Sequence, residues 1–454
     1  MSMVNGRNEA DRTLGAQQSQ EGQQSTQVRK AAFASAIGTT IEWYDFFLYN
    51  TAAALTFPHL FFPESSAYAG AIESFATYAV GFAARPVGAA IFGYWGDRIG
   101  RKATLIVTLL AMGLASALVG VLPGASTIGI AAPLILVLLR LVQGIAIGGE
   151  WSGSVLLTME WGNQRKRGLL GSFAQIGVPV GLVLGTGGMT LLSALLSPDA
   201  FNSWGWRVPF LASLILVVVG LIIRLQILET PMFAAVVAEN RISRAPVMEA
   251  VRHHWREILL SAGLRFSEQM PFYLFTSYVL VYVVAQHHYS KTFVLNAVLI
   301  AAVLELFTIP WFSHLSDRLG RKRVYLTGAV LTGVLAFPYF AVLKDGGYVA
   351  IFIAVVVSMI PHAMQYGPQA ALISENFPTH LRYGGAGLGY QLASVFAGGP
   401  APLLATWLLA VTGTPFSIAG YIVLSAVVTV ICGWLIKDRS RSDISAEATY
   451  ARTA

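Results

Sequence analysis

Long apolar stretches separated by short polar segments run through almost the whole chain. Each stretch is close to the ~20 residues that an α-helix needs to cross a bilayer, and no ~10-residue alternating strand pattern recurs. A helix is the spanning element that satisfies its own backbone hydrogen bonds in lipid. The pattern therefore predicts an all-α membrane protein with twelve transmembrane helices, over residues 33–57, 72–96, 103–122, 130–157, 168–194, 207–227, 257–285, 292–315, 323–343, 348–374, 383–411 and 415–436.

One polar connection inside the apolar region is much longer than the others. Residues 228–256 contain Glu229-Thr-Pro231, which stops the sixth helix because the residue before a proline disfavours the helical conformation. A segment this short cannot bury a core of its own. We therefore expect a cytoplasmic linker, with a short amphipathic segment near Met248–Glu257, between a six-helix half at 31–227 and another at 257–436.

The two ends of the chain are polar. Residues 1–30 are rich in Gln and Ser and lack an apolar core, so they are predicted to be a disordered cytoplasmic tail rather than a signal peptide. Residues 437–454 are predicted to be a second cytoplasmic tail. Most of the 30 basic residues lie in these tails, in the linker and in alternate loops. This asymmetry favours cytoplasmic termini, in a multi-pass protein of the bacterial inner membrane.

Composition excludes several other classes of protein. Hydrophobic residues make up 55% of the chain and charged residues 12%, against about 25% charged residues in soluble domains. The single cysteine, Cys432, rules out an internal disulfide or a cysteine metal cluster. The net charge of +7 lies in loops that suit lipid headgroups, so no nucleic acid is expected. We expect no metal, no cofactor and a monomer.

A short charged signature occurs twice, at Gly93–Lys102 and at Ser313–Arg323. The two copies lie about half a chain length apart, which indicates duplication of a half-protein, and two related halves are typical of a secondary transporter. Glycine permits a tight turn, and the aspartate can pair with an arginine or a neighbouring helix end and so hold the halves in one state. Ser313 replaces the glycine of the first copy, which puts the second turn in question. The residues expected to act in these gating loops are Gly93, Asp97, Arg98, Gly100 and Arg101 in the first copy and Asp317, Arg318, Gly320 and Arg321 in the second.

This signature resembles the loop motif of the major facilitator superfamily. Two further segments resemble intramembrane motifs of that superfamily, Arg140–Glu150 and Gly171–Gly181. Three more resemble its metabolite:proton symporter family, which includes shikimate, α-ketoglutarate, citrate and proline/betaine transporters: Glu42–Tyr49, Trp204–Phe210 and Glu375–Arg382. The resemblance implies the major facilitator fold and proton-coupled uptake of a small metabolite.

Charges inside the predicted helices are candidates for function, because a charge at the bilayer centre costs at least ~2.5–3.5 kcal/mol. Glu42 and Asp45 share a helix face at i, i+3, and two such close carboxylates make a proton acceptor. Arg265 and Glu268 repeat this spacing in the second half. The ionisable residues expected to bind proton or substrate are Glu42, Asp45, Arg85, Arg140, Glu150, Arg265, Glu268 and Glu305. The residues expected to line the pocket are Trp43, Tyr44, Tyr49 and Gln143.

Structural roles remain open for several of these residues. Glu42 and Arg140 could form a buried pair that only orients helices, and Arg85 could be structural as well. The aromatic residues could simply pack. His362 is expected to be a packing residue rather than a proton relay.

The favoured function is a proton-coupled symporter that imports a small carboxylate, such as a shikimate-like or dicarboxylic acid. Arg85 carries this expectation, because an arginine near the midplane keeps its charge and needs an anion. A proline/betaine symporter, a proton-driven exporter and a transporter-like sensor are the alternatives. An ATP-driven pump and an enzyme are disfavoured, since the chain has no Gly-Lys dipeptide, no His-Glu-x-x-His and no Gly-x-Ser-x-Gly.

Overall fold

A computed structural model describes the backbone of residues 2–65 and 67–450, and side chains from Ser25 onward except at 66–69, 71, 72, 75 and 78. The described residues form helices and no strand. The long helices of the first half are α1 (Ser2–Leu55), α3 (Ala67–Gly96), α4 (Arg101–Val121), α6 (Ala131–Trp161), α7 (Arg167–Gln175) with α8 (Gly177–Leu195), and α10 (Arg207–Leu225). Those of the second half are α13 (Trp255–Leu264), α14 (Phe266–Tyr273) and α15 (Val279–His287) in one line, α16 (Lys291–Leu319), α17 (Arg321–Asp345), α18 (Tyr348–Ser374), α19 (Arg382–Ala393) with α20 (Ala401–Thr412), and α21 (Phe416–Leu435).

Counted in this way, the described residues form twelve spans, as the hydrophobic pattern predicts. Nine of them are long and apolar enough to cross a membrane by length and composition alone. The other three are α1, α3 and the line α13–α15. Two of the spans, α13–α15 and α19–α20, contain a π-helical turn, at Leu274–Tyr278 (η3) and Ser394–Gly398 (η4). The predicted all-α membrane class and its twelve helices are confirmed.

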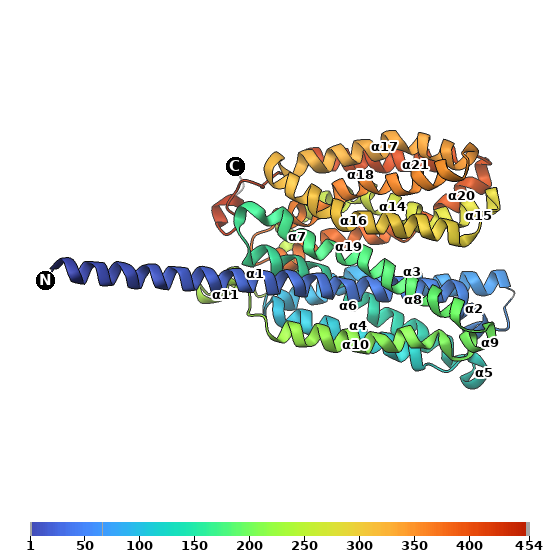
Figure 1. Ribbon diagram of the computed structural model, residues 1–454, viewed down its shortest axis with the longest axis horizontal. Helices are drawn as coiled ribbons and strands as arrows, with labels where there is room; N and C mark the ends of the chain where they lie inside the picture. Colours follow the sequence, from blue (N-terminus) through green and yellow to red (C-terminus); the bar gives the residue numbers. More distant parts are fainter. Residues whose placement is uncertain (1, 66, 451–454) are drawn as a thin grey trace.

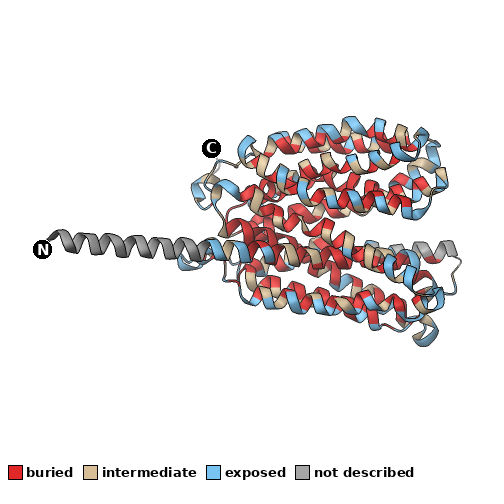
Figure 2. Cartoon of the chain, viewed as in Figure 1, coloured by how far each residue is buried: buried red, intermediate tan, exposed pale blue. Residues whose placement is uncertain are grey.

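The two halves lie side by side, and both chain ends lie at the same end of the bundle (Figure 1). We call this end the terminal face. Buried residues concentrate where the halves meet, whereas exposed residues follow the outer surface (Figure 2). That outer surface carries large apolar side chains, among them Phe307, Trp311 and Trp434, each more than two-thirds exposed. An exposed apolar belt of this kind suits contact with lipid.

The short elements lie between the spans. The segment expected to be a linker contains α11 (Pro231–Ala238) and α12 (Pro246–His253), and α12 overlaps the predicted amphipathic stretch. The remaining short helices are α2 (Phe57–Phe61), α5 (Ala125–Ile128), α9 (Pro198–Ala200) and a π turn at Phe201–Gly205 (η2). Short helices of this length act as connectors here.

The amino-terminal tail differs from its prediction as disordered, because α1 begins at Ser2. The segment 2–30 has no proline and several residues of good helix propensity, so the first spanning helix can continue beyond the apolar region. Of the carboxyl-terminal tail, residues 451–454 lie outside the described residues, as does Met1.

Candidate functional site

Asp97, just after α3, contacts the other half of the molecule at the terminal face. Its two carboxylate oxygens accept the backbone N–H groups of Tyr383 and Gly384, in the first turn of α19, at 3.1 and 2.9 Å. Arg101 lies 3.3 Å from the same carboxylate. Burial raises the pKa of Asp97 to about 7, while Arg101 and the two N–H donors lower it in part. The negative group thus caps the positive end of a helix dipole.

A buried network extends from this cap. Arg101 lies 3.3 Å from Glu160, at the end of α6, and Arg382 of the second half lies 3.3 Å from the same carboxylate. Arg101 also donates to the Thr379 carbonyl oxygen at 2.8 Å. We call Asp97, Arg101, Glu160 and Arg382 the first terminal cluster. It joins the two halves with two arginines and two carboxylates.

The second copy of the signature makes the reciprocal contacts. Asp317 accepts the N–H groups of Gly168–Leu169, in the first turn of α7, both at 2.9 Å. Arg321 lies 2.5 Å from Asp317 and 3.3 Å from Glu375, and Arg167 of the first half lies 2.8 Å from Glu375. We call these four charged residues, Asp317, Arg321, Glu375 and Arg167, the second terminal cluster. Each half therefore caps a helix of the other.

The glycines of the signature have separate roles. Gly100 and Gly320 have positive φ angles of 109° and 101°, so each permits the turn that the sequence predicts. Gly93 lies inside α3 instead, where an added Cβ would be 2.6 Å from the Cα of Gly384. Ser313 at the equivalent place does not affect the second turn, because it also lies within a helix, α16. The second turn therefore forms although Ser313 replaces a glycine, because Gly320 supplies the positive φ angle.

The other signature cations lie outside the clusters. Arg98 and Arg318 are both exposed, and Arg98 lies over the ring of Tyr94 at 4.9 Å. Their position at the end of the spans suits contact with lipid headgroups.

Residues 436–450 cross the terminal face after α21, and we call them the carboxyl-terminal strap. Ile444 is fully buried, and its carbonyl oxygen accepts a hydrogen bond from Arg382 at 2.7 Å. Arg167 donates to three carbonyl oxygens between residues 439 and 442, at 3.1–3.4 Å. The strap therefore contacts one arginine from each terminal cluster.

A cavity of about 10 Å³ lies deep between the halves, room for about one water molecule. It is lined by Trp43, Val178, Arg265, Glu268, Gln269, Phe272, Tyr273, His362, Tyr366 and Tyr390. Of the four residues expected to line a pocket, Trp43 does so. Tyr44 instead donates to the Pro209 carbonyl oxygen at 2.7 Å, Tyr49 bonds to Thr77 at 2.6 Å, and Gln143 lies outside the lining. The helical period turns these three side chains towards neighbouring helices of their own half.

Three charged or titratable residues of the second half, Arg265, Glu268 and His362, line this cavity, and Glu305 contacts His362 behind it. Arg265 lies 3.2 Å from Glu268, as their i, i+3 spacing predicts. His362 lies between two carboxylates: its Nδ1 is 2.5 Å from Glu305 and its Nε2 is 3.6 Å from Glu268. We call Arg265, Glu268, Glu305 and His362 the second central cluster. His362 thus packs among buried residues, as the sequence indicates, and in addition has carboxylate partners on two other helices.

The charges of the first half form a different arrangement. Arg85 lies over the rings of Phe46 and Phe82, at 5.0 and 4.5 Å, and its positive charge acts on Glu42. Asp45 accepts a hydrogen bond from Gln143 at 3.4 Å, and Arg140 is its main cationic neighbour. We call Glu42, Asp45, Arg85 and Arg140 the first central cluster. Both arginines of this cluster lie over the ring of Phe46, at 5.0 Å for Arg85 and 5.8 Å for Arg140.

Among the described residues, Arg85 has no acidic group within salt-bridge distance. Arg140 donates to Gln143 at 3.3 Å and lies over the ring of Tyr49 at 4.2 Å. Glu150, expected near the proton or substrate, pairs with Arg224 of α10 and accepts a hydrogen bond from Thr108 at 2.7 Å. Arg224 is the partner that the sequence analysis did not identify.

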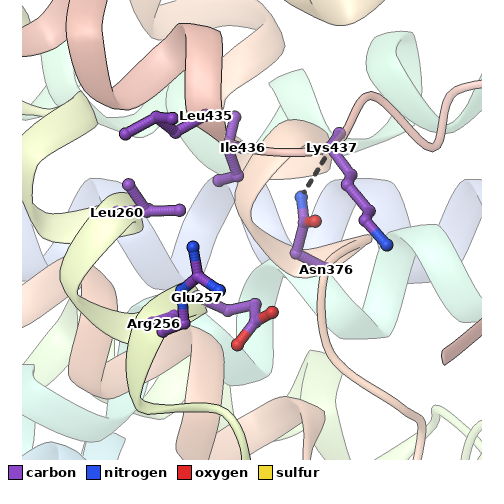
Figure 3. A pocket seen from close by; sticks show the side chains of 7 residues that line it. All are labelled: Arg256, Glu257, Leu260, Asn376, Leu435, Ile436 and Lys437. Atoms are coloured by element: carbon purple, nitrogen blue, oxygen red, sulfur yellow. Dashed lines mark hydrogen bonds between the residues drawn. The ribbon is translucent and has the colours of Figure 1, made fainter. Parts of the chain in front are cut away.

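A larger cavity of about 290 Å³ opens at the terminal face, away from the central charges. Figure 3 shows its lining: Arg256, Glu257, Leu260, Asn376, Leu435, Ile436 and Lys437. Asn376 donates to the Lys437 carbonyl oxygen at 3.1 Å and so holds the start of the strap beside α18. The small central cavity has the charged lining that a polar substrate needs, so we take it as the candidate site. Within the described residues, no group of three or more His, Cys, Asp or Glu side chains is arranged to hold a metal.

Comparisons with known proteins place this architecture in a family. Residues 31–247 match the family described as sugar (and other) transporters, and residues 264–451 match the Major Facilitator Superfamily. The shikimate transporter of Escherichia coli is 39% identical over 95% of this chain and 100% of its own length. An inner membrane metabolite transport protein of Escherichia coli is also 39% identical, over 84% of this chain and 87% of its own. A proline/betaine transporter of Salmonella typhimurium is 31% identical over 90% of this chain and 84% of its own.

Solved structures with the same fold are more distant in sequence. A proton:xylose symporter superposes with a TM-score of 0.72 at 18% identity, covering 94% of this chain and 100% of its own. A fucose:proton symporter of Escherichia coli gives 0.65 at 16% identity, covering 89% and 98%. These relatives and neighbours are transporters rather than enzymes by name. The chain therefore belongs to the major facilitator superfamily of membrane transporters and, within it, to the metabolite:proton symporter family.

Proposed function

We propose that this transporter imports a small carboxylate together with a proton across the bacterial inner membrane. A shikimate-like or dicarboxylic acid is the favoured substrate. The terminal face then lies in the cytoplasm, as the concentration of Lys and Arg in its loops indicates. The similarity to a shikimate transporter over its full length supports the substrate class. The proton:xylose and fucose:proton symporters of the same fold support the coupling.

One observation carries the substrate class: Arg85 is 2% exposed and has no acidic partner within salt-bridge distance among the described residues. An arginine keeps its charge even when buried, and a buried cation without a partner is costly. Its neighbours Phe46 and Phe82 contact Tyr273 in the cavity wall, with ring centroids 6.1 and 5.7 Å apart. A single aromatic layer therefore separates a cation from the cavity.

A carboxylate that entered this space would give Arg85 the direct ion-pair partner that it lacks among the described residues. The planar guanidinium can bind a carboxylate through two parallel hydrogen bonds, whereas an ammonium group cannot. The cavity must enlarge to admit a metabolite, because its present volume fits about one water. Rotation of Phe46 or Phe82 would open the path to Arg85.

The test is ligand binding to the purified protein and to Arg85→Lys. We expect shikimate or a dicarboxylate to raise the unfolding temperature of the parent protein, and glycine betaine and proline to do so much less. Arg85→Lys should weaken carboxylate binding by about tenfold or more, because it loses the bidentate pair while it keeps the charge. The matched control is the exposed Arg98→Lys, which should bind as the parent does.

Two results would contradict the proposal. If Arg85→Lys binds the carboxylate as tightly as the parent, Arg85 is a structural residue. If the parent binds betaine or proline and no carboxylate, the chain is a zwitterion symporter like the proline/betaine relative.

A further inference from the structure

His362 has the surroundings of a proton carrier in addition to those of a packing residue. It is 4% exposed and lies on α18, with Glu305 of α16 at Nδ1 and Glu268 of α14 towards Nε2. Its ring stacks between Phe272, at 4.9 Å, and Tyr366, at 5.2 Å, which fixes the plane of the imidazole. A histidine held between two buried carboxylates can bind a proton on either nitrogen.

A count of buried charges shows where a proton is missing. Among the described residues, eight buried arginines face nine buried carboxylates, counting Asp317, whose side chain is 5% exposed. Both terminal clusters hold two of each, as does the first central cluster, and Glu150 pairs with Arg224. Only the second central cluster is unequal, with Arg265 against Glu268 and Glu305.

That cluster carries one surplus negative charge while His362 is neutral. The other titratable groups around it are the hydroxyls of Tyr273, Tyr325, Tyr366 and Tyr390, from α14, α17, α18 and α19, and a phenol is uncharged at neutral pH. Glu42 of α1 also lies within electrostatic reach of Arg265. A net charge buried at this depth is costly. One added proton removes it.

We propose that His362 and Glu305 share the coupling proton, and that Glu268 relays its presence to Arg265 in the cavity wall. This inference rests on the proton-coupled symport proposed above. It places the proton site in the second half rather than at Glu42 and Asp45, where the sequence pattern predicts it. Because the two groups are in contact, the proton belongs to the pair rather than to either residue.

The relay follows from the position of Glu268. It lies 3.2 Å from Arg265 on one side and 3.6 Å from His362 on the other, and Gln369 donates to it at 2.8 Å. A proton on the imidazole increases its attraction for Glu268, which weakens the hold of Glu268 on Arg265. The guanidinium of Arg265 lines the cavity and becomes available to an anionic substrate. Proton and carboxylate then bind together more readily than either does alone.

The test uses proteoliposomes with an inside-alkaline gradient, first with shikimate and then with proline as the probe. A step of one pH unit can drive about tenfold accumulation when one proton moves with each substrate. Glu305→Gln makes the cluster neutral without a proton. We expect its accumulation ratio to fall to about one, while exchange at equal concentrations survives and loses its dependence on pH between 6 and 8.

Two further variants separate a proton role from a merely structural one. His362→Gln should also lose accumulation, whereas Glu305→Asp, which keeps an ionisable group, should recover part of it. The exposed His59→Gln is the matched control and should accumulate substrate as the parent does. A structural role would instead reduce exchange and accumulation together and leave the pH profile of exchange unchanged.

A measurement without substrate keeps this inference distinct from the proposed function. Infrared difference spectra, acid minus alkaline, are recorded in an Asp97→Asn background, because Asp97 has a pKa of about 7. They should show a proton-dependent signal that Glu305→Gln and His362→Gln lose and Glu42→Gln retains. If the parent accumulates neither probe but the Asp97→Asn background shows this signal, the proposed substrate class fails and the proton site stands. If Glu305→Gln accumulates substrate normally, or if Glu42→Gln alone loses the signal, the proton site is not at His362 and Glu305.

Discussion

Asp97 and Asp317 make the same contacts in opposite halves, since each accepts two backbone N–H groups from the first turn of a helix across the interface. The arginines and glutamates around them correspond as well. At the centre of the bundle the halves differ: the first central cluster balances its charges, whereas the second has a surplus carboxylate and a histidine. The two terminal clusters, which join the halves at the terminal face, have thus stayed alike after duplication. The proposed proton site lies in the second half alone.

The largest effect should come from removing one arginine of a terminal cluster. Arg167→Gln or Arg382→Gln removes one of the two arginines that contact a buried glutamate and leaves the cluster with one surplus negative charge. Breaking a buried ion pair in this way typically costs 3–5 kcal/mol. We expect similar losses of unfolding temperature for the two variants in detergent, because the clusters correspond. The exposed Arg98→Gln should change stability by less than about 1 kcal/mol. A large loss in only one of the two would show that the clusters are not equivalent.

A smaller effect should distinguish Gly93 from Ser313. In Gly93→Ala the new Cβ would lie 2.6 Å from the backbone of Gly384, and crowding of this kind costs about 1–3 kcal/mol. Ser313→Ala only removes a hydroxyl that donates to the Ile309 carbonyl oxygen of its own helix, so it should cost about 1 kcal/mol or less. The unfolding temperature and the initial uptake rate of each variant measure these two effects. Equal effects would mean that the contact of α3 with α19 is no tighter than the equivalent contact of α16 with α7.

The smallest effect concerns pH and the two aspartates. The closed face holds the pKa of Asp97 at about 7, and contact with water on opening would return it towards 3.8. The closed state therefore binds the proton more tightly, so closure is favoured below about pH 7 and loses this advantage as the pH rises through 7. Raising the pH from 6 to 8 should shift the population towards the open state by up to about tenfold.

Substitution checks this assignment. Asp97→Asn should remove the pH dependence, measured with a fluorescent reporter of opening, and should slow uptake with substrate affinity nearly unchanged. Asp317→Asn should slow uptake but leave the pH dependence in place. A parent protein whose opening does not change between pH 6 and 8 would contradict the titration of Asp97.

The sequence predicts local features of the site well. The i, i+3 spacing of Arg265 and Glu268 places them on one helix face, where they form an ion pair. Hydrophobic length predicts the spans, and the repeated signature predicts the glycine turns at Gly100 and Gly320. These features depend on a few neighbouring residues, so a pattern in the chain is enough to find them.

Contacts between distant helices could not be predicted in the same way. His362 has its carboxylates 57 and 94 positions away in the chain, and nothing in its own segment indicates them. Arg224, at the end of α10, similarly gives no local sign that it would pair with Glu150. Helix rotation and packing decide which charged faces meet, and these depend on the whole bundle.

The carboxyl-terminal strap contacts Arg167 and Arg382 through four backbone carbonyl oxygens and through one side chain, the Tyr450 hydroxyl, which lies 3.1 Å from Arg382. Any residue supplies a carbonyl oxygen, so the segment other than Tyr450 could change its amino acids widely during evolution and still make the same four backbone bonds. An alignment of relatives would then show little sequence conservation in this carboxyl-terminal segment. Shortening the chain from its carboxyl end, or fusing a bulky reporter there, would reveal a contribution that single substitutions and sequence comparison both miss.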